Sequence, residues 1–382
     1  MANRDMEETL APDADTGELL TSPLHQRHVA AGAKFAAFSG WFMPLEYAGA
    51  GVLAEHAAVR NAVGIFDVSH LGKATVTGAG AVDFVNRCLT ADLGKIGPGQ
   101  AQYTLICNED GGVVDDMIVY LKSDDEAFLI PNAANCEQVV ALLASAAPTG
   151  VTVVNQHRDF AVLAVQGTLS DEVLSATGLP AGHDYMTFVG TDVEQTPVTV
   201  CRTGYTGERG YELVVPVQDA LSVWDAVVAA GEPYGLQPAG LGARDTLRTE
   251  MGYPLHGQDI SPTITPVQAR LGWAVGWTKE SFFGSEALRA EKQAGPKRLL
   301  RGLRAVGRGI PRPGMAVHSP DGRDVGTVTS GTFSPTLKIG IGLALIEAGL
   351  RDDDVVTVDI RSREESFVIT KPPFVTPGVR ES

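Results

Sequence analysis

Two adjacent carboxylates, Asp115 and Asp116, interrupt a run of residues that otherwise has the composition of a β-strand. Gly111 and Gly112 precede them as a turn, and the run 113–120 is rich in Val, Ile and Tyr. Asp is disfavoured in strands, and burying a carboxylate is costly unless it is paired or hydrogen-bonded. A local conflict of this kind is expected at functional sites. The pair is therefore the first candidate for acid–base or electrostatic chemistry.

Strand geometry predicts that only one of the two acids faces a given pocket, because side chains alternate across a strand. Asp116 is expected to share its face with Val114 and Ile118. Asp115 is expected on the opposite face. The residue pattern alone does not choose between them, and a structural reading is also open, in which the acids cap a turn or pair with a nearby arginine.

The composition of the whole chain limits the classes of function. With 382 residues, 44% of them hydrophobic, the chain is long enough for two or three folded domains. Its formal net charge of −16 argues against a nucleic-acid partner, because phosphate binding needs a basic surface. No apolar run approaches the ~20 residues of a membrane-spanning helix, and the N-terminal sequence lacks a targeting pattern. We therefore expect a cytoplasmic protein without a membrane partner.

Neither a metal site nor a hydrolase triad is indicated by the other reactive side chains. The chain has four cysteines, Cys88, Cys107, Cys136 and Cys201. They are scattered, without CxxC or a histidine at zinc-ligand spacing, which predicts small core residues in a reducing compartment. Asp67, Ser69 and His70 are neighbours on an extended segment and cannot converge on one point, and the sequence has no Gly-x-Ser-x-Gly motif.

The elements that would position Asp116 follow a pattern that occurs twice along the chain. The first set has strands near 73–77, 102–107, 113–121 and 127–131 and helices near 80–89 and 135–146. The second set has strands near 160–166, 185–190, 197–203 and 211–215 and helices near 170–177 and 218–230. The pattern predicts two tandem helix-backed antiparallel sheets of the α+β class. Short strands separated by Gly and Pro over 298–370 predict a small all-β barrel or sandwich.

Two further segments carry side chains suited to a pocket. Residues 204–212 contain three glycines among charged and aromatic residues, which predicts a hairpin tip. In the helix expected over 239–251, Arg244 and Arg248 are four residues apart and share a face. A solvated helix face is the alternative for these two arginines. Trp273 is expected on a strand that follows this helix.

Five stretches, in a fixed order, carry a family resemblance: GIFDVSH (64–70), GGVVDD (111–116), TGYTGE (203–208), GARDTLR (242–248) and TSGTFSP (329–335). Together they resemble the T-protein of the glycine cleavage system, the tetrahydrofolate-dependent aminomethyltransferase. The resemblance implies a three-domain clover-leaf of the α+β class, with two interleaved ferredoxin-like α+β domains and a C-terminal all-β barrel or jelly roll around a central folate site. The polar and acidic residues 1–20 predict a flexible tail. We expect the folate-binding core at 21–290 and the barrel domain at 291–382.

Carried over position by position, the resemblance makes Asp116 the catalytic acid. It assigns the folate pocket to Leu71, Tyr103, Tyr120, Asn132, Tyr205, Glu212, Arg244 and Trp273. Glu212 suits the donor edge of a pterin, because a carboxylate accepts from both an amino group and a ring N–H. Arg244 is expected to steady this acid or a ligand carbonyl. Tyr103, Tyr205 and Trp273 are expected to supply flat apolar walls.

The implied reaction takes a one-carbon unit from the lipoylated H-protein of the glycine cleavage system and gives it to tetrahydrofolate, without a metal. Loss of sulfur from the aminomethyl carbon gives an iminium-like electrophile, which a folate nitrogen attacks. Ammonia leaves, and 5,10-methylenetetrahydrofolate forms. A carboxylate beside the folate would stabilise the developing positive charge or take a proton.

Other functions stay open on the sequence alone. One is a tetrahydrofolate-dependent demethylase of the same superfamily that acts on a free methylated donor. Another is a non-transferase folate-binding relative linked to iron–sulfur maintenance and RNA, but residues 279–286, KESFFGSE, lack the cysteine of its Lys-x-Gly-Cys-Tyr-x-Gly-Gln-Glu motif. A purely structural interaction protein would leave Asp116 and Glu212 unexplained.

Overall fold

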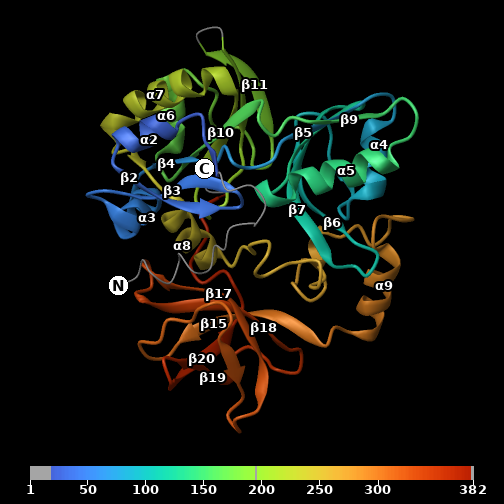
Figure 1. Ribbon diagram of the computed structural model, residues 1–382, viewed down its shortest axis with the longest axis vertical. Helices are drawn as coiled ribbons and strands as arrows, with labels where there is room; N and C mark the ends of the chain where they lie inside the picture. The colour runs from blue at the N-terminus through green and yellow to red at the C-terminus, as the bar shows by residue number, and fades with distance from the viewer. Residues whose placement is uncertain (1–18, 194–195, 380–382) are drawn as a thin grey trace.

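The computed structural model describes residues 19–193 and 196–379, and these form three lobes around a common centre (Figure 1). Two lobes are built on mainly antiparallel sheets backed by helices, and the third is a closed barrel. Most of the predicted tail at 1–20, namely residues 1–18, lies outside the described residues.

The first lobe holds the strand with the two acids. Its five-stranded sheet has the order β6-β7-β8-β5-β9, formed by β5 (Ala74–Thr77), β6 (Ala101–Cys107), β7 (Val113–Ser123), β8 (Glu126–Ile130) and β9 (Thr152–Asn155). Helices α4 (Ala81–Cys88) and α5 (Cys136–Ala146) pack their apolar residues into the core on one face of this sheet. The opposite face, with Tyr120 and Ile130, turns toward the second lobe.

The second lobe is a six-stranded sheet of order β11-β12-β13-β10-β4-β14. Its strands are β4 (Gly64–Asp67), β10 (Phe160–Gln166), β11 (Phe188–Val193), β12 (Thr196–Cys201), β13 (Gly210–Pro216) and β14 (Gln237–Pro238). Helices α6 (Ser170–Thr177) and α7 (Ala220–Gly231) cover one face. Strand β4 precedes the whole five-stranded sheet in sequence yet pairs with β10. The two lobes are therefore interleaved, as the resemblance implied, and the tandem arrangement predicted from the repeated pattern is wrong.

Smaller elements join the lobes. A three-stranded sheet of order β1-β3-β2 consists of β1 (Leu20–Thr21), β2 (Ala33–Phe38) and β3 (Trp41–Tyr47). The remaining helices are α2 (His25–Ala30), α3 (Gly51–Asn61), α8 (Leu241–Met251) and α9 (Ser285–Ala294). Residues from α3 and α8 pack into the core between the two sheets. Helix α9 leads into the barrel (Figure 1).

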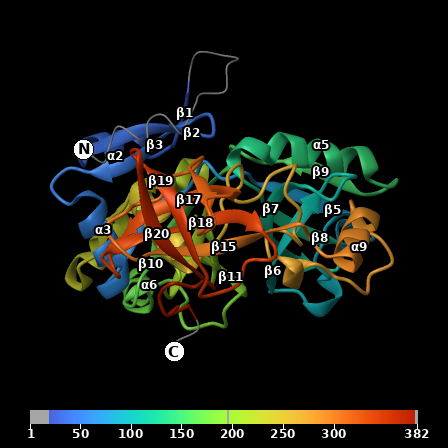
Figure 2. The same ribbon diagram turned by 90° about the horizontal axis from the view of Figure 1, so that it is seen from below.

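The third lobe is a closed six-stranded barrel of order β15-β18-β17-β16-β19-β20. It comprises β15 (Arg298–Ala305), β16 (Ala316–His318), β17 (Asp324–Ser334), β18 (Ile339–Glu347), β19 (Val355–Ile360) and β20 (Arg363–Thr370). Its interior is filled by branched apolar residues and Phe367. Seen from below, the barrel strands lie between the α3 side and the α9 side of the molecule (Figure 2). The predicted domain boundary at residues 290 and 291 stays a prediction.

Two local expectations fail for identifiable reasons. The register of β6 and β7 shifts between Ile106 and Cys107, and this bulge turns Val114 into the core below α4 and α5 rather than onto the face of Asp116. Trp273 lies on a 3-10 turn, Gly272–Ala274, and not on a strand. The indole N–H of Trp277 donates to the carbonyl of Gly272 at 2.8 Å, which favours the tight turn.

Candidate active site

A cavity of about 820 Å³ lies where the three lobes meet. The five-stranded sheet contributes Tyr103 and Asp116, the six-stranded sheet contributes Glu212, and the barrel contributes Leu300 and Leu343. All the residues that the resemblance assigned to the site line this one cavity: Leu71, Tyr103, Asp116, Tyr120, Asn132, Tyr205, Glu212, Arg244 and Trp273. Their roles stay predictions.

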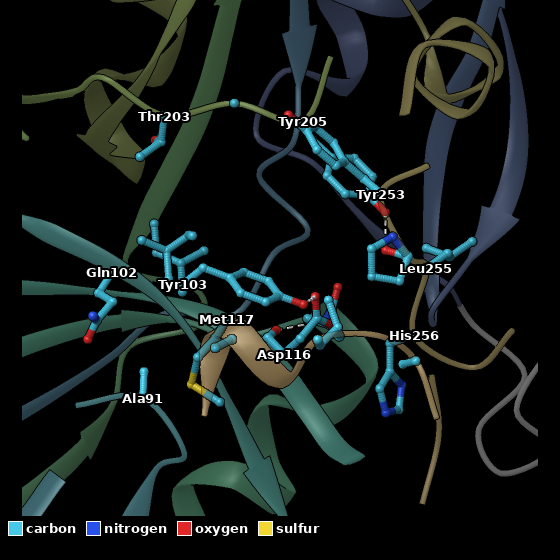
Figure 3. Close-up of a pocket in the computed structure, with 18 of the residues that line it drawn as sticks. Ala91, Gln102, Tyr103, Asp116, Met117, Thr203, Tyr205, Tyr253, Leu255 and His256 are labelled. Atoms are coloured by element: carbon cyan, nitrogen blue, oxygen red, sulfur yellow. Dashed lines mark hydrogen bonds between the residues drawn. The ribbon is translucent and has the colours of Figure 1, made fainter. Parts of the chain in front are cut away.

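Asp116 presents its carboxylate to the cavity between two donors (Figure 3). The hydroxyl of Tyr103 donates to Oδ2 at 3.0 Å, and Nδ2 of Asn132 donates to Oδ1 at 2.9 Å. The ring of Tyr103 is itself stacked on Trp273, with centroids 5.4 Å apart. Burial raises the pKa of Asp116, although both hydrogen bonds act to lower it. The carboxylate is thus held in place and sits in surroundings that favour proton uptake.

Asp115 differs from its neighbour because it is fully buried and does not line the cavity. It accepts from the backbone N–H of Asn132 at 2.9 Å, from Nδ2 of Asn132 at 2.8 Å and from Nδ2 of Asn135 at 2.7 Å. Burial and the charge of Asp116 raise the pKa of Asp115 to about 8. The choice between the two acids that strand alternation left open is therefore resolved geometrically: only Asp116 reaches the cavity.

Glu212 and Arg244 place a second set of polar groups in the cavity wall. Glu212 is 7% exposed and accepts from the hydroxyl of Thr203 at 2.6 Å. That hydroxyl lies 3.2 Å from the hydroxyl of Tyr120. The Nη1 atom of Arg244 is buried and has no hydrogen-bond partner within residues 19–193 and 196–379. Burial lowers the pKa of Arg244, whereas the charge of Glu212 raises it.

Aromatic rings form the flat parts of the wall. Tyr205 stacks on Tyr253 with centroids 5.7 Å apart (Figure 3), and its hydroxyl donates to the carbonyl of Pro254. The guanidinium of Arg244 lies 4.8 Å from the centre of the Tyr205 ring. An accepting carboxylate, a guanidinium whose Nη1 has no partner in the described chain, and aromatic walls fit a flat heterocycle that carries N–H donors and a carbonyl. A reduced pterin has this set of groups.

Sequence reasoning missed three residues that surround the predicted ones. Tyr253 completes the aromatic wall, and His256 and Asn135 stand next to the two acids. The histidine lies 3.0 Å from Nδ2 of Asn135 through Nδ1 and 3.1 Å from the carbonyl of Val113 through Nε2. No spacing rule joins residues 113, 135 and 256, because they meet only after the lobes have packed.

Asp67, Ser69, His70 and the four cysteines lie in ordinary structural surroundings. Asp67 bonds His28 at 2.8 Å and the backbone N–H of Ser69 at 2.9 Å, so Asp67, Ser69 and His70 form no triad. The four cysteines are free and buried. In the part of the chain that the structure describes, no cluster of His, Cys, Asp or Glu side chains is arranged to hold a metal ion. No helix of that part is long and apolar enough to cross a membrane.

Comparisons with known proteins indicate the same protein family along nearly the whole chain. Residues 24–279 match the family model of the GCVT N-terminal domain, and residues 298–376 match that of the glycine cleavage T-protein C-terminal barrel domain. The chain is 63% identical to an aminomethyltransferase of Frankia alni, over 94% of this chain and 98% of that protein. It is 60% identical to an aminomethyltransferase of Mycobacterium avium, over 96% and 100%.

A solved structure agrees with the sequence relatives. The glycine cleavage system aminomethyltransferase T of Bartonella henselae is 34% identical and superimposes with a TM-score of 0.89, over 94% of this chain and 99% of that chain. The family predicted from the five motifs and the α+β fold with a C-terminal barrel are both confirmed. The chain belongs to the glycine cleavage T-protein family of aminomethyltransferases.

Proposed function

We propose that the cavity binds tetrahydrofolate and that the chain transfers to it the one-carbon unit of an aminomethyl group carried on the dihydrolipoyl arm of H-protein. The products are ammonia, 5,10-methylenetetrahydrofolate and the dithiol form of the carrier. The observation that carries this proposal is the placement of Asp116, which two donors hold at the wall of a cavity of about 820 Å³. The relatives named aminomethyltransferase support the same reaction.

Each polar group has a distinct role in this proposal. Glu212 accepts from the N–H donors at one edge of the pterin, and its bond from Thr203 fixes one of its oxygens. Arg244, whose Nη1 lacks a partner in the described chain, donates to the ligand carbonyl. Tyr103, Tyr205 and Trp273 hold the ring system by stacking. Leu71, Tyr120 and Asn132 complete the pocket.

Asp116 serves the transfer step through its negative charge. The carbon–sulfur bond breaks with its electron pair on sulfur, which becomes a thiol on protonation, while the nitrogen lone pair forms the iminium. One folate nitrogen then attacks the carbon, and after a proton shift the amine leaves as ammonia, which gives a second iminium. The second folate nitrogen attacks this iminium, closes the ring and loses its proton. A carboxylate held beside these cationic states lowers their energy and is placed to take the proton that the folate nitrogen loses. Walls that exclude water protect the electrophile from hydrolysis.

The proposal is tested by ammonia release from aminomethyl-loaded H-protein, with and without tetrahydrofolate. Folate-stimulated ammonia together with methylenetetrahydrofolate is the expected result. If folate binds but the loaded carrier stays intact, the donor assignment is wrong and free methylated donors become the candidates. If folate does not bind, the pocket assignment itself fails. We further propose that the reaction takes place in the cytoplasm, where the four buried free thiols remain reduced.

A further inference from the structure

We propose that Asp115, which does not reach the cavity, is a positioning residue for the transfer reaction. It fixes the amide of Asn132, and through this amide it fixes the carboxylate of Asp116. The turnover predicted below rests on the proposed function, whereas the arrangement of the three side chains rests on their hydrogen bonds alone.

One end of the Asn132 amide is shared by both acids. Its Nδ2 lies 2.8 Å from Oδ1 of Asp115, 2.9 Å from Oδ1 of Asp116 and 3.0 Å from the backbone carbonyl of Asp116. Because the backbone carbonyl of Asp116 only accepts hydrogen bonds, this end must be the NH₂ group. The amide oxygen is thereby turned away from the acids. Since Asn132 lines the cavity, its orientation is part of the binding surface.

The register of the sheet explains how acids on opposite faces of a strand reach one side chain. Ile130, the last residue of β8, pairs with Ile118 of β7. Continuing that antiparallel register places residue 132 beside residue 116, just beyond the end of β8. At this free end the side chain is not confined to one face of the sheet. Asn132 therefore bridges the buried face of Asp115 and the cavity face of Asp116.

Asp115 is the anchor of this bridge because it holds Asn132 twice, through the backbone N–H at 2.9 Å and through Nδ2 at 2.8 Å. It is fully buried, and no salt bridge to it occurs among the residues that the structure describes. Burying a carboxylate without a cation destabilises the folded state, and an apolar side chain would fill the same space without this cost. The amide of an asparagine at this position could accept only two of these three N–H groups, so the second carboxyl oxygen serves the geometry of Asn132.

A second branch ties Asp115 to its own strand. Nδ2 of Asn135 donates to Asp115 at 2.7 Å and lies 3.0 Å from Nδ1 of His256. Nε2 of His256 lies 3.1 Å from the carbonyl of Val113, which only accepts, so Nε2 carries the proton and Nδ1 accepts from Asn135. The chain of bonds returns to β7 two residues before Asp115. This closed ring of hydrogen bonds ties the carboxyl group of Asp115 to its own strand.

The test is Asp115→Asn in the full chain, measured with aminomethyl-loaded H-protein. We expect kcat to fall about 10–100-fold, as for a small displacement of a reacting group, while the Kd for tetrahydrofolate changes less than about threefold. Asn132→Ala alone should also slow turnover, and the double variant should be no slower than Asn132→Ala. Unchanged turnover in Asp115→Asn, or losses that multiply in the double variant, would overturn the proposal.

Glu55→Gln is the matched control for the loss of a buried carboxylate. Glu55 is also fully buried and accepts from two backbone N–H groups, those of Tyr47 at 2.6 Å and Gly240 at 2.9 Å, but it does not line the cavity. This variant should lose thermal stability yet keep the kcat of the folded enzyme. An equal loss of kcat in Glu55→Gln would show that Asp115 acts only through general stability.

A readout without turnover separates this proposal from the proposed function. The side-chain NH₂ signals of Asn132 in a selectively labelled protein should be sharp and protected from exchange in the wild type, and broadened in Asp115→Asn. Asn135→Ala, which removes only one donor, should give a smaller change if Asp115→Asn does not fold. Signals of Asn132 that are identical in wild type and variants would refute the positioning role even if no transferase activity is found.

Discussion

Replacing Asp116 by Asn isolates the charge of this residue from its shape. In the native site Oδ1 accepts from Asn132 at 2.9 Å and Oδ2 accepts from Tyr103 at 3.0 Å. An Asn side chain keeps its oxygen toward Asn132 and turns its NH₂ toward the Tyr103 oxygen, which is able to accept. Both contacts therefore survive, and we expect Asp116→Asn to fold and to bind tetrahydrofolate nearly as well as the wild type.

The expected loss is in turnover. A group that stabilises charge or moves a proton in the transition state contributes about 10²–10⁴-fold in rate, or about 3–5 kcal/mol. Because both hydrogen bonds of Asp116 persist in the variant, little of this loss should appear in folate affinity. The wild type should also lose activity as the pH falls through a value above the ordinary 3.8 of an aspartate, since burial raises the pKa of Asp116.

The same substitution should not lower stability at neutral pH. A carboxyl whose pKa is higher in the folded than in the unfolded state contributes stability at low pH, and this contribution is lost as the pH rises through the folded value. Burial raises the pKa of Asp116 above 3.8, so its ionisation opposes folding at neutral pH. Asp116→Asn cannot ionise, and its melting temperature relative to the wild type should rise from pH 4 to pH 8.

The two measurements are single-turnover ammonia release and calorimetric melting over this pH range. Loss of turnover with equal or higher stability is the outcome that the structure predicts. Turnover within about threefold of the wild type would remove the charge of Asp116 from the mechanism. A large drop in melting temperature at pH 8 would mean instead that the carboxylate supports the fold, and the functional interpretation of its burial would be wrong.

Three further substitutions probe the pocket and the packing of the lobes. Glu212→Gln should weaken tetrahydrofolate binding about 10–100-fold, since it weakens charge-assisted hydrogen bonds, and an unaltered Kd by calorimetry would contradict the pterin role. Trp273→Ala should weaken binding about 3–10-fold with almost no change in melting, because the side chain is 70% exposed. Glu250→Gln should destabilise the fold by about 3 kcal/mol in chemical denaturation, because it breaks the 2.8 Å ion pair with Arg60. Burial opposes ionisation of Glu250, but the hydrogen bond and charge of His56 hold its pKa at about 2. The wild type should therefore have the higher free energy of unfolding above pH 4.5, and this difference should vanish as the pH falls toward 2.

Local elements were predictable because strong periodicity marks them. The helix expected over 135–146 is α5, Cys136–Ala146, and the helix expected over 239–251 is α8, Leu241–Met251. Strand partners were not predictable in the same way. Strand β4 pairs with β10, so that Phe66 lies opposite Ala164. All strands of the five-stranded sheet lie between these two residues in the sequence, and no local pattern encodes a partner at that separation. The interleaved order therefore came only from the family resemblance.

The arrangement of the candidate site could not be predicted in full for a similar reason. The alternation of side chains along a strand correctly predicted that Asp115 and Asp116 face opposite ways. It could not predict which face would line a cavity that three lobes form together. The bulge beside Val114 also depends on pairing with β6, not on the sequence of β7 alone. Asn132 was assigned to the pocket, yet its contact with both acids follows from its place beyond the end of β8.

Helix α8 links the barrel to the cavity, in addition to the barrel residues Leu300 and Leu343 that line it. The solvated face considered for this helix is wrong: Arg248 is 2% exposed and bonds Asp259 and Ser330, both at 2.9 Å. Arg244, one turn earlier on the same face, reaches the cavity. Because Ser330 belongs to β17, helix α8 connects the barrel to the cavity-lining Arg244. The barrel thus contacts the helix that carries Arg244 into the cavity, which gives a physical reason for three lobes around one cavity.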